Sequence, residues 1–188
     1  YLSKLLLEKG YEVYGTYRRL STPNFWRLQY LQIFGQINLI PLDLADTGSI
    51  IEAIQIADPD EIYNLAAQSF VEASFEQPVA TADVSGLAVT RILEAIRQIK
   101  RSAKFYQASS SEMFGCVENR VKPLTEKDVF KPLSPYAASK LYAYWITKIY
   151  RDAYGVFACN GIFFNHESPI RGLEFVTRKI SNAVAKIK

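Results

Sequence analysis

Short apolar runs alternate along this chain with longer stretches that carry apolar residues at every third or fourth position. The short runs are bounded by polar residues, glycine or proline, which is the pattern of strands. The stretches between most of them are long enough for a helix. The predicted strands are Glu12–Arg18, Ile37–Pro41, Glu61–Ala66, Lys104–Ala108 and Val156–Phe164.

The longer stretches predict helices, the clearest from about Ala80 to Lys100 and over Pro135–Tyr154. Asp46 is a suitable N-cap for a helix over Thr47–Ile56. Helical patterns also cover the first eight residues and Glu174–Lys188. Strands that alternate with helices predict an α/β fold, a doubly wound parallel sheet of the Rossmann-like type with helices on both faces.

Two segments are typical of loops, Leu20–Gln32 and the long Gly115–Pro135. Loops of the second length within a compact domain often have a function. The first helical pattern begins at Tyr1 and ends at Gly10. We therefore expect that a strand and a glycine-rich loop precede the printed sequence.

Polar residues follow each of the five predicted strands. In parallel α/β sheets the carboxyl ends of the strands meet at one edge, where ligands bind. We therefore expect these residues to surround one crevice, although loops are polar in any protein. The segments are Arg18-Arg19, Asp43, Ala67-Gln68-Ser69, Ser109-Ser110-Ser111-Glu112 and Asn165-His166-Glu167-Ser168.

Composition narrows the classes of function. The 188 residues carry a formal net charge of +3, too small to indicate a nucleic-acid partner. No apolar run approaches the roughly 20 residues of a membrane span. One histidine and two cysteines, Cys116 and Cys159, do not make a metal site, and we interpret both thiols as structural. We expect a reduced, cytoplasmic setting.

Tyr136 and Lys140 are four residues apart at the start of a predicted helix, so their side chains share one face. A nearby ammonium group favours the phenolate, which predicts a lowered pKa for Tyr136 and a base near neutral pH. Chance produces this spacing often in a chain with 12 tyrosines. The serine cluster at Ser109–Ser111 strengthens the case because it can supply a hydroxyl to the same site.

These residues resemble the extended short-chain dehydrogenase/reductases, in which a tyrosine, a lysine and a serine or threonine assist hydride transfer to a nicotinamide. The resemblance is sharper still to one group within them, the GDP-mannose 4,6-dehydratases, and it runs over the whole chain. The segments that carry it occur in order: Asn64-Leu65-Ala66-Ala67-Gln68-Ser69, Ser111-Glu112-Met113-Phe114-Gly115, Ser134-Pro135-Tyr136, Asn165-His166-Glu167-Ser168-Pro169 and Arg171–Lys179.

The resemblance implies a catalytic set of Ser110, Glu112, Tyr136 and Lys140, where Ser110 replaces the usual threonine. It implies that Ser69 and Asn165 face the nucleotide sugar, with GDP-mannose as the substrate. The other implied residues contact NADP together with Tyr136 and Lys140: Asp43, Leu44, Leu65, Ala67, Ser69, His166 and Arg171.

The resemblance also implies a division of the chain and an assembly. Residues 1–164 would form the NADP-binding domain, and residues 165–188 would begin the nucleotide-sugar-binding region. Phe25 and Trp26 lie in a segment that reaches a neighbouring subunit in the family, so we expect a homodimer or homotetramer. Ile170 departs from the arginine that is usual at its position, which weakens any inference about phosphate contacts there.

The predicted strand Glu12–Arg18 bears on the choice of cofactor. In dinucleotide-binding folds an acidic residue at the end of this strand holds the ribose 2′-hydroxyl, whereas an arginine accommodates a 2′-phosphate. Here the strand ends in Arg18-Arg19 with no carboxylate nearby in the sequence. The sequence therefore predicts NADP in preference to NAD.

Two other functions remain open at this level. An epimerase or ketoreductase of the same fold shares the tyrosine and lysine but needs no carboxylate beside the serine cluster. Glu112 is therefore the residue that discriminates between these enzymes and a dehydratase. A non-catalytic protein that only binds a dinucleotide is the third reading, and the presence of Glu112, Tyr136 and Lys140 argues against it.

Overall fold

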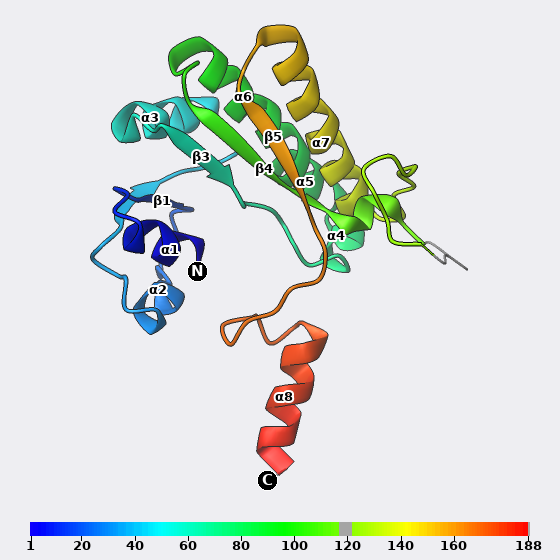
Figure 1. The fold of residues 1–188 in the computed structure, drawn as a ribbon. Helices are drawn as coiled ribbons and strands as arrows, with labels where there is room; N and C mark the ends of the chain where they lie inside the picture. The colour runs from blue at the N-terminus through cyan, green and yellow to red at the C-terminus, as the bar shows by residue number, and fades with distance from the viewer. Residues whose placement is uncertain (117–121, 188) are drawn as a thin grey trace.

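The computed structural model describes residues 1–116 and 122–187, and it confirms the α/β fold class (Figure 1). The five predicted strands are present, and all their pairings are parallel. They lie in two sheets: β1 (Tyr14–Tyr17) pairs with β2 (Asn38–Pro41), and a three-stranded sheet has the order β3-β4-β5. The strands of the second sheet are β3 (Glu61–Asn64), β4 (Lys104–Ser110) and β5 (Ala158–Phe163).

The predicted helices are also found, together with shorter elements, some of which the sequence pattern missed. The longer helices are α1 (Leu2–Glu8), α3 (Thr47–Ala57), α6 (Ala88–Ile99), α7 (Pro135–Tyr154) and α8 (Val176–Ile187). The short ones are α2 (Trp26–Tyr30), α4 (Ala73–Glu76), α5 (Pro78–Ala82), the π-helical η1 (Asp83–Leu87) and the 3₁₀-helical η2 (Ser111–Phe114).

Caps explain why two of the helices begin where the sequence predicts. The Asp46 carboxylate accepts hydrogen bonds from the backbone N–H groups of Gly48 and Ser49 at 3.0 and 3.1 Å, which confirms it as the N-cap of α3. The Ser134 hydroxyl accepts from the N–H of Ala137 at 3.0 Å and starts α7. Gly155, with φ of 65°, ends α7 in the left-handed conformation that glycine adopts without strain.

The helical stretch predicted from about Ala80 to Lys100 is confirmed, and it contains a π-helical turn that the sequence pattern did not predict. Five residues form a π-helical turn, η1, between α5 and α6. Within η1, Gly86 lies against the backbone of α7: a Cβ atom at Gly86 would be 3.4 Å from the carbonyl oxygen of Ser139. Hydrophobic spacing reports which face of a helix is buried, but it does not detect one extra residue in a turn.

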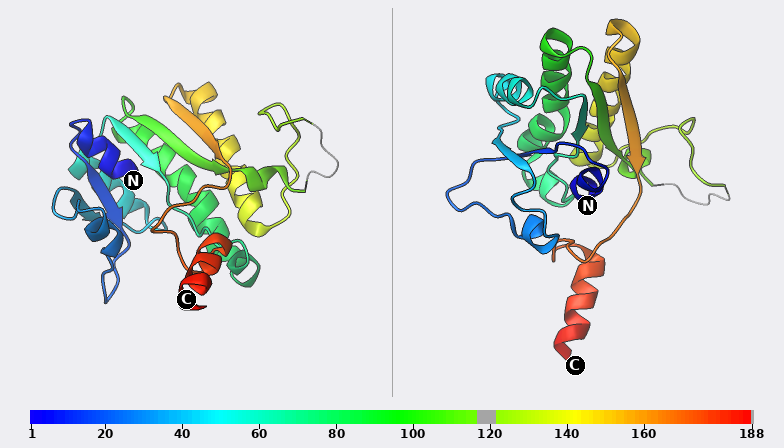
Figure 2. Two further views of the ribbon diagram at one scale, coloured as in Figure 1. Left: turned by 60° about the horizontal axis from the view of Figure 1, so that its bottom comes forward. Right: turned by 60° about the vertical axis from the view of Figure 1, so that its left-hand side comes forward.

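The main core lies between one face of the three-stranded sheet and helices α3, α6 and α7 (Figure 2). Leu93 and Ile96 of α6 are fully buried there against Phe105 of β4. On the opposite face of this sheet, Tyr106 lies between Tyr63 and Phe163, with ring centroids 6.0 and 6.1 Å apart. Tyr63 and Phe163 are exposed, so the prediction of helices on both faces is met for one face within the described residues.

A second apolar cluster joins the beginning of the chain to the segment after β5. Ile170 is only 9% exposed and packs with Val13, Ile33 and Ile37. Its carbonyl oxygen accepts a hydrogen bond from Nε of Arg27 in α2 at 3.1 Å. The arginine expected at position 170 would place a charge in this cluster, and isoleucine removes that cost.

The loop interpretation of Leu20–Gln32 is wrong for its second half, where α2 forms. Phe25 packs on its own domain, with its ring centroid 5.2 Å from that of Tyr17 and 5.5 Å from that of Phe34. Trp26 remains exposed, and the Arg27 guanidinium carbon lies 4.9 Å from the centroid of its ring. An aromatic side chain in a polar segment can therefore serve the local core.

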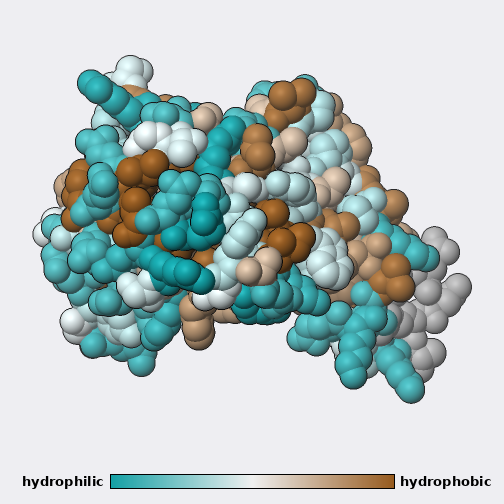
Figure 3. All heavy atoms as spheres, turned by 90° about the horizontal axis from the view of Figure 1, so that it is seen from above, coloured by the Kyte–Doolittle hydropathy of each residue, from teal (hydrophilic) through white to brown (hydrophobic). Residues whose placement is uncertain are grey.

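Figure 3 shows the molecule from above, where apolar side chains reach the surface in separate patches among polar ones. Three of the exposed apolar side chains, Tyr142, Trp145 and Ile149, share one face of α7. Among residues 1–116 and 122–187, no helix is both long and apolar enough to cross a membrane.

Replacement of Ile170 by arginine tests the second cluster. A guanidinium at this buried position should lower the free energy of unfolding by about 2–4 kcal/mol. The matched variant Ile56→Arg, at a position in α3 that is 54% exposed, should change it by less than about 0.5 kcal/mol. Urea denaturation followed by circular dichroism measures both values, and equal losses would contradict the packing described for Ile170.

Candidate active site

Two elements bring the predicted catalytic residues together at the carboxyl end of β4. The strand runs to Ser110, two residues further than predicted, and η2 follows it directly. Ser110 is the N-cap of η2, and its Oγ accepts a hydrogen bond from the backbone N–H of Glu112 at 3.2 Å. This cap holds the backbone of Glu112 next to the Ser110 hydroxyl, while the carboxylate remains exposed to solvent.

Tyr136 and Lys140 approach the same place from the first turns of α7. They are 9% and 3% exposed, and the Nζ atom of Lys140 lies 5.9 Å from the centroid of the Tyr136 ring. The Ser110 side chain is near enough to Tyr136 to act on the pKa of its phenol. The structure therefore brings Ser110, Glu112, Tyr136 and Lys140 close together where β4, η2 and α7 meet.

The predicted lowering of the Tyr136 pKa is wrong for the ligand-free chain. Burial of the phenol raises its pKa, and the charge of Glu112 raises it further, whereas the Ser110 side chain and the charge of Arg171 act in the opposite direction. Burial lowers the pKa of Lys140 to about 8. Spacing along the helix shows that the two side chains meet, but it does not report the desolvation that dominates both pKa values.

A buried polar chain beneath the site was not predicted. Nδ2 of Asn64 donates to Oε1 of Gln107 at 2.8 Å, and Nε2 of Gln107 donates to the carbonyl oxygen of Ala108 at 2.9 Å. The same carbonyl oxygen accepts from Nζ of Lys140 at 2.9 Å. The available signal was an amide residue directly after two apolar or aromatic residues in each of two strands, in Ile62-Tyr63-Asn64 and Phe105-Tyr106-Gln107.

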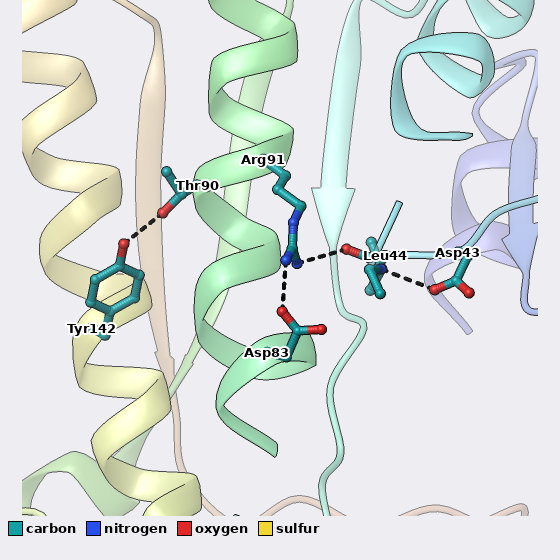
Figure 4. A network of polar contacts seen from close by, with 7 residues as sticks. Asp43, Leu44, Asp83, Thr90, Arg91 and Tyr142 are labelled. Carbon is teal, nitrogen blue, oxygen red and sulfur yellow. Dashed lines mark hydrogen bonds and ion pairs between the residues drawn. The ribbon is translucent and has the colours of Figure 1, made fainter. Parts of the chain in front are cut away.

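The loop after β2 carries Asp43 and Leu44 (Figure 4). Oδ1 of Asp43 accepts from the N–H of Ala45 at 2.9 Å, and Nη1 of Arg91 donates to the carbonyl oxygen of Leu44 at 3.2 Å. Arg91 also pairs with Asp83 at 2.7 Å. Arg91 in α6 and Asp83 in η1 therefore hold this loop, and sequence patterns alone give neither residue a role.

The loop after β3 carries Leu65, Ala67 and Ser69. Leu65 and Ser69 are exposed, and Ala67 is half-buried. Between the last two, the backbone N–H of Gln68 donates to Oγ of Ser85 in η1 at 3.1 Å. Oε1 of Gln68 is buried and has no partner in the described part of the chain. This loop thus has an acceptor that a ligand could satisfy.

The segment after β5 carries Asn165, His166 and Arg171. Asn165 and His166 are exposed, and a hydrogen bond of 2.8 Å joins Nδ1 of His166 to the carbonyl oxygen of Phe164. Arg171 lies over the ring of Phe175, 3.5 Å from its centroid, and its charge acts on Tyr136. Packing of Ile170 in the second apolar cluster holds this segment beside the site.

The residues present fit a phosphorylated dinucleotide. Arg18 and Arg19 are exposed at the end of β1, and no ion pair joins either to a carboxylate within the ranges that the structure describes. A guanidinium in this state is a good partner for phosphate. The orphan Oε1 of Gln68 adds an acceptor for a hydroxyl or amide. Among the described residues, no hydrogen bond or ion pair joins Arg18 or Arg19 to the predicted catalytic residues Ser110, Glu112, Tyr136 and Lys140.

Comparison with solved structures supports the fold. The dTDP-glucose 4,6-dehydratase DesIV of Streptomyces venezuelae, solved with NAD bound, superposes with a TM-score of 0.85 at 20% identity, over 97% of this chain and 57% of that one. RMD from Pseudomonas aeruginosa, complexed with NADPH, superposes with a TM-score of 0.74 at 26% identity, over 85% of this chain and 56% of that one.

Sequence comparison identifies the family. The GDP-mannose 4,6-dehydratase of Yersinia enterocolitica is 49% identical over all of this chain, which spans 52% of that protein. This chain thus spans about half the length of the curated relatives that it matches. The family model described as GDP-mannose 4,6 dehydratase matches residues 1–188. The chain belongs to the GDP-mannose 4,6-dehydratase family.

Proposed function

We propose that the full protein is an NADP-dependent lyase that converts GDP-mannose to GDP-4-keto-6-deoxymannose. The observation that carries the proposal is the placement of the Glu112 carboxylate at the same site as Ser110, Tyr136 and Lys140. The last three suffice for oxidation and reduction at a hydroxyl. Only an elimination requires a second acid–base group, so Glu112 favours a dehydratase.

Tyr136 in its phenolate form takes the proton from the 4-hydroxyl of the sugar and becomes the phenol, and the Lys140 ammonium group favours the phenolate that is needed as the base. Burial raises the pKa of Tyr136 in the ligand-free chain, so the phenol must first release its proton to solvent before it acts as the base. When bound, NADP would supply the redox chemistry, as the acceptor of hydride from carbon 4 and the donor of hydride to carbon 6. Ser110 donates a hydrogen bond to the oxygen at carbon 4.

Glu112 carries out the elimination. The 4-keto group acidifies the proton on carbon 5, and the carboxylate removes it. Water then leaves from carbon 6, with its proton delivered by Glu112 or through Ser110. The exposure of Glu112 suits this role, because a carboxylate at the surface can reach a bound sugar.

The remaining predicted residues bind cofactor and substrate. Arg18 and Arg19 accommodate the 2′-phosphate of NADP, which fits their exposure without a carboxylate partner. Ser69 and Asn165 face the nucleotide sugar. The other cofactor contacts come from the loops after β2 and β3 and from the segment after β5: Asp43, Leu44, Leu65, Ala67, His166 and Arg171.

We also propose a homodimer or homotetramer. The face of α7 that carries Tyr142, Trp145 and Ile149 supports this assembly, because three exposed apolar side chains on one helix face are typical of an interface. The segment Leu20–Gln32 was expected to reach a neighbouring subunit through Phe25 and Trp26. Phe25 packs on its own domain, so Trp26 is the one of these two that remains for such a contact. We keep 1–164 and 165–188 as the two functional regions.

Glu112→Gln should separate the two halves of the reaction. Oxidation at carbon 4 should continue, visible as absorbance of the reduced cofactor, while product formation should fall by about a hundredfold or more because the base is gone. With wild-type protein, deuterium placed at carbon 4 should appear at carbon 6 of the product. The exposed Glu76→Gln in α4 is the control. Loss of that deuterium to solvent would overturn the mechanism.

Reversal of charge at Arg18 and Arg19 should remove the preference for NADP. The double variant to glutamate should weaken NADP binding by at least about tenfold, since a charge-assisted hydrogen bond is lost, and should change NAD binding much less. The control variant carries Lys4→Glu in α1 and Lys9→Glu at its C-cap, both at exposed positions. It changes the net charge by the same amount as the double arginine variant and should leave both affinities unchanged. Calorimetric titration measures them, and tighter binding of NAD by the unaltered protein would refute the assignment.

Light scattering of the full-length protein tests the assembly. We expect the mass of a dimer or tetramer, and a shift to monomer in Trp145→Glu, because a buried carboxylate without a partner opposes association. Trp26→Glu examines the start of α2 in the same way and should leave the mass unchanged if Trp26 stays exposed in the assembly. A monomeric wild-type protein would contradict the proposal.

A further inference from the structure

Two polar side chains lie inside the three-stranded sheet where apolar residues are the rule. Gln107 in β4 is fully buried, and Asn64, its partner residue in β3, is buried as well. The Asn64 amide donates to the Gln107 side chain at 2.8 Å. Burial of an amide costs free energy unless its groups are bonded, so a pair of this kind in a sheet needs an explanation.

Asn64 orients the Gln107 amide, which in turn contacts the backbone carbonyl that bonds to Lys140. Because Oε1 of Gln107 accepts from Asn64, its Nε2 is turned toward the carbonyl oxygen of Ala108, 2.9 Å away. That oxygen also accepts from Nζ of Lys140 at 2.9 Å. Among the described residues this is the hydrogen bond that the Lys140 ammonium group makes, so the carbonyl fixes the position of this charge.

Other charges around α7 are engaged elsewhere. Asp83 in η1 pairs with Arg91, and Glu94 in α6 pairs with Arg97. Glu112 in η2 is exposed and acts on Tyr136. The shift in the Lys140 pKa has burial as its cause, with no contribution from a neighbouring charge. The Ala108 carbonyl is therefore the main group that favours the charged form of Lys140 in the ligand-free chain.

We propose that Gln107 and Asn64 are positioning residues, which hold the carbonyl of Ala108 against the ammonium group of Lys140. The alternative is that the pair only satisfies buried polar groups between β3 and β4. The catalytic part of the proposal rests on the proposed function. The effect on Lys140 itself does not, because it concerns the ligand-free protein.

Gln107→Met keeps the length of the side chain and removes both hydrogen bonds. The ammonium group then faces a carbonyl that is no longer held, and the charged form loses stabilisation. We expect the pKa of Lys140, followed by NMR of ¹⁵N-labelled lysine, to fall by about one unit below its wild-type value. Asn64→Leu, which leaves Gln107 in place without its orienting donor, should lower it in the same direction by less.

In the full protein with GDP-mannose, we expect kcat of Gln107→Met to fall by about tenfold or more with little change in KM. The alkaline limb of the kcat profile should move to lower pH with the Lys140 pKa. Thr147→Val is the matched control: Thr147 is fully buried in the same helix, donates to the carbonyl oxygen of Ala143 at 2.7 Å, and lies away from the site. It should leave the pKa of Lys140 and the pH profile unchanged.

The outcomes separate this proposal from the proposed function. A wild-type protein that does not turn over GDP-mannose refutes the function, and the NMR titration still decides the positioning role. An unchanged Lys140 pKa in both Gln107→Met and Asn64→Leu would overturn the positioning role. An equal loss of kcat in Thr147→Val would overturn it as well, because the loss would then reflect general damage to the core.

Discussion

The hydrogen bond between the buried ammonium group of Lys140 and the carbonyl oxygen of Ala108 is the contact on which the site depends. It joins the first turns of α7 to the end of β4, and these two elements carry Tyr136 and Ser110. A lysine that is 3% exposed pays a large desolvation cost, visible in its lowered pKa. The carbonyl offsets part of that cost, which makes the geometry of β4 part of the electrostatics of the site.

The π-helical turn η1 has a similar role for the loops around the site. Ser85 accepts from the backbone of Gln68 after β3, and Asp83 pairs with Arg91, which bonds to Leu44 after β2. Gly86 lets the turn approach α7 at the residue next to Lys140. One irregular turn thereby contacts the loop after β3 and α7 directly, and the loop after β2 through Arg91, in keeping with the frequent occurrence of such turns at functional sites.

The second apolar cluster connects parts of the site that are far apart in the sequence. Ile170 lies beside residues of the first 40 positions, and Arg27 bonds to its backbone. The segment with Asn165, His166 and Arg171 is thereby attached to the unit that ends in Arg18 and Arg19. The family resemblance predicts that both groups contact one cofactor. The packing of Ile170 holds the two groups in fixed positions relative to one another, as a shared cofactor requires.

Local chemistry along the sequence determined much of this protein. Ser134, Pro135 and Gly155 set the bounds of α7, and the four-residue spacing placed Tyr136 and Lys140 on one face, because caps and helical periodicity act within a few residues. Tertiary structure decided the rest: the interruption at η1, the pairing of Gln107 with Asn64, and the raised pKa of Tyr136. These depend on burial and on partners from distant segments, which no local pattern contains.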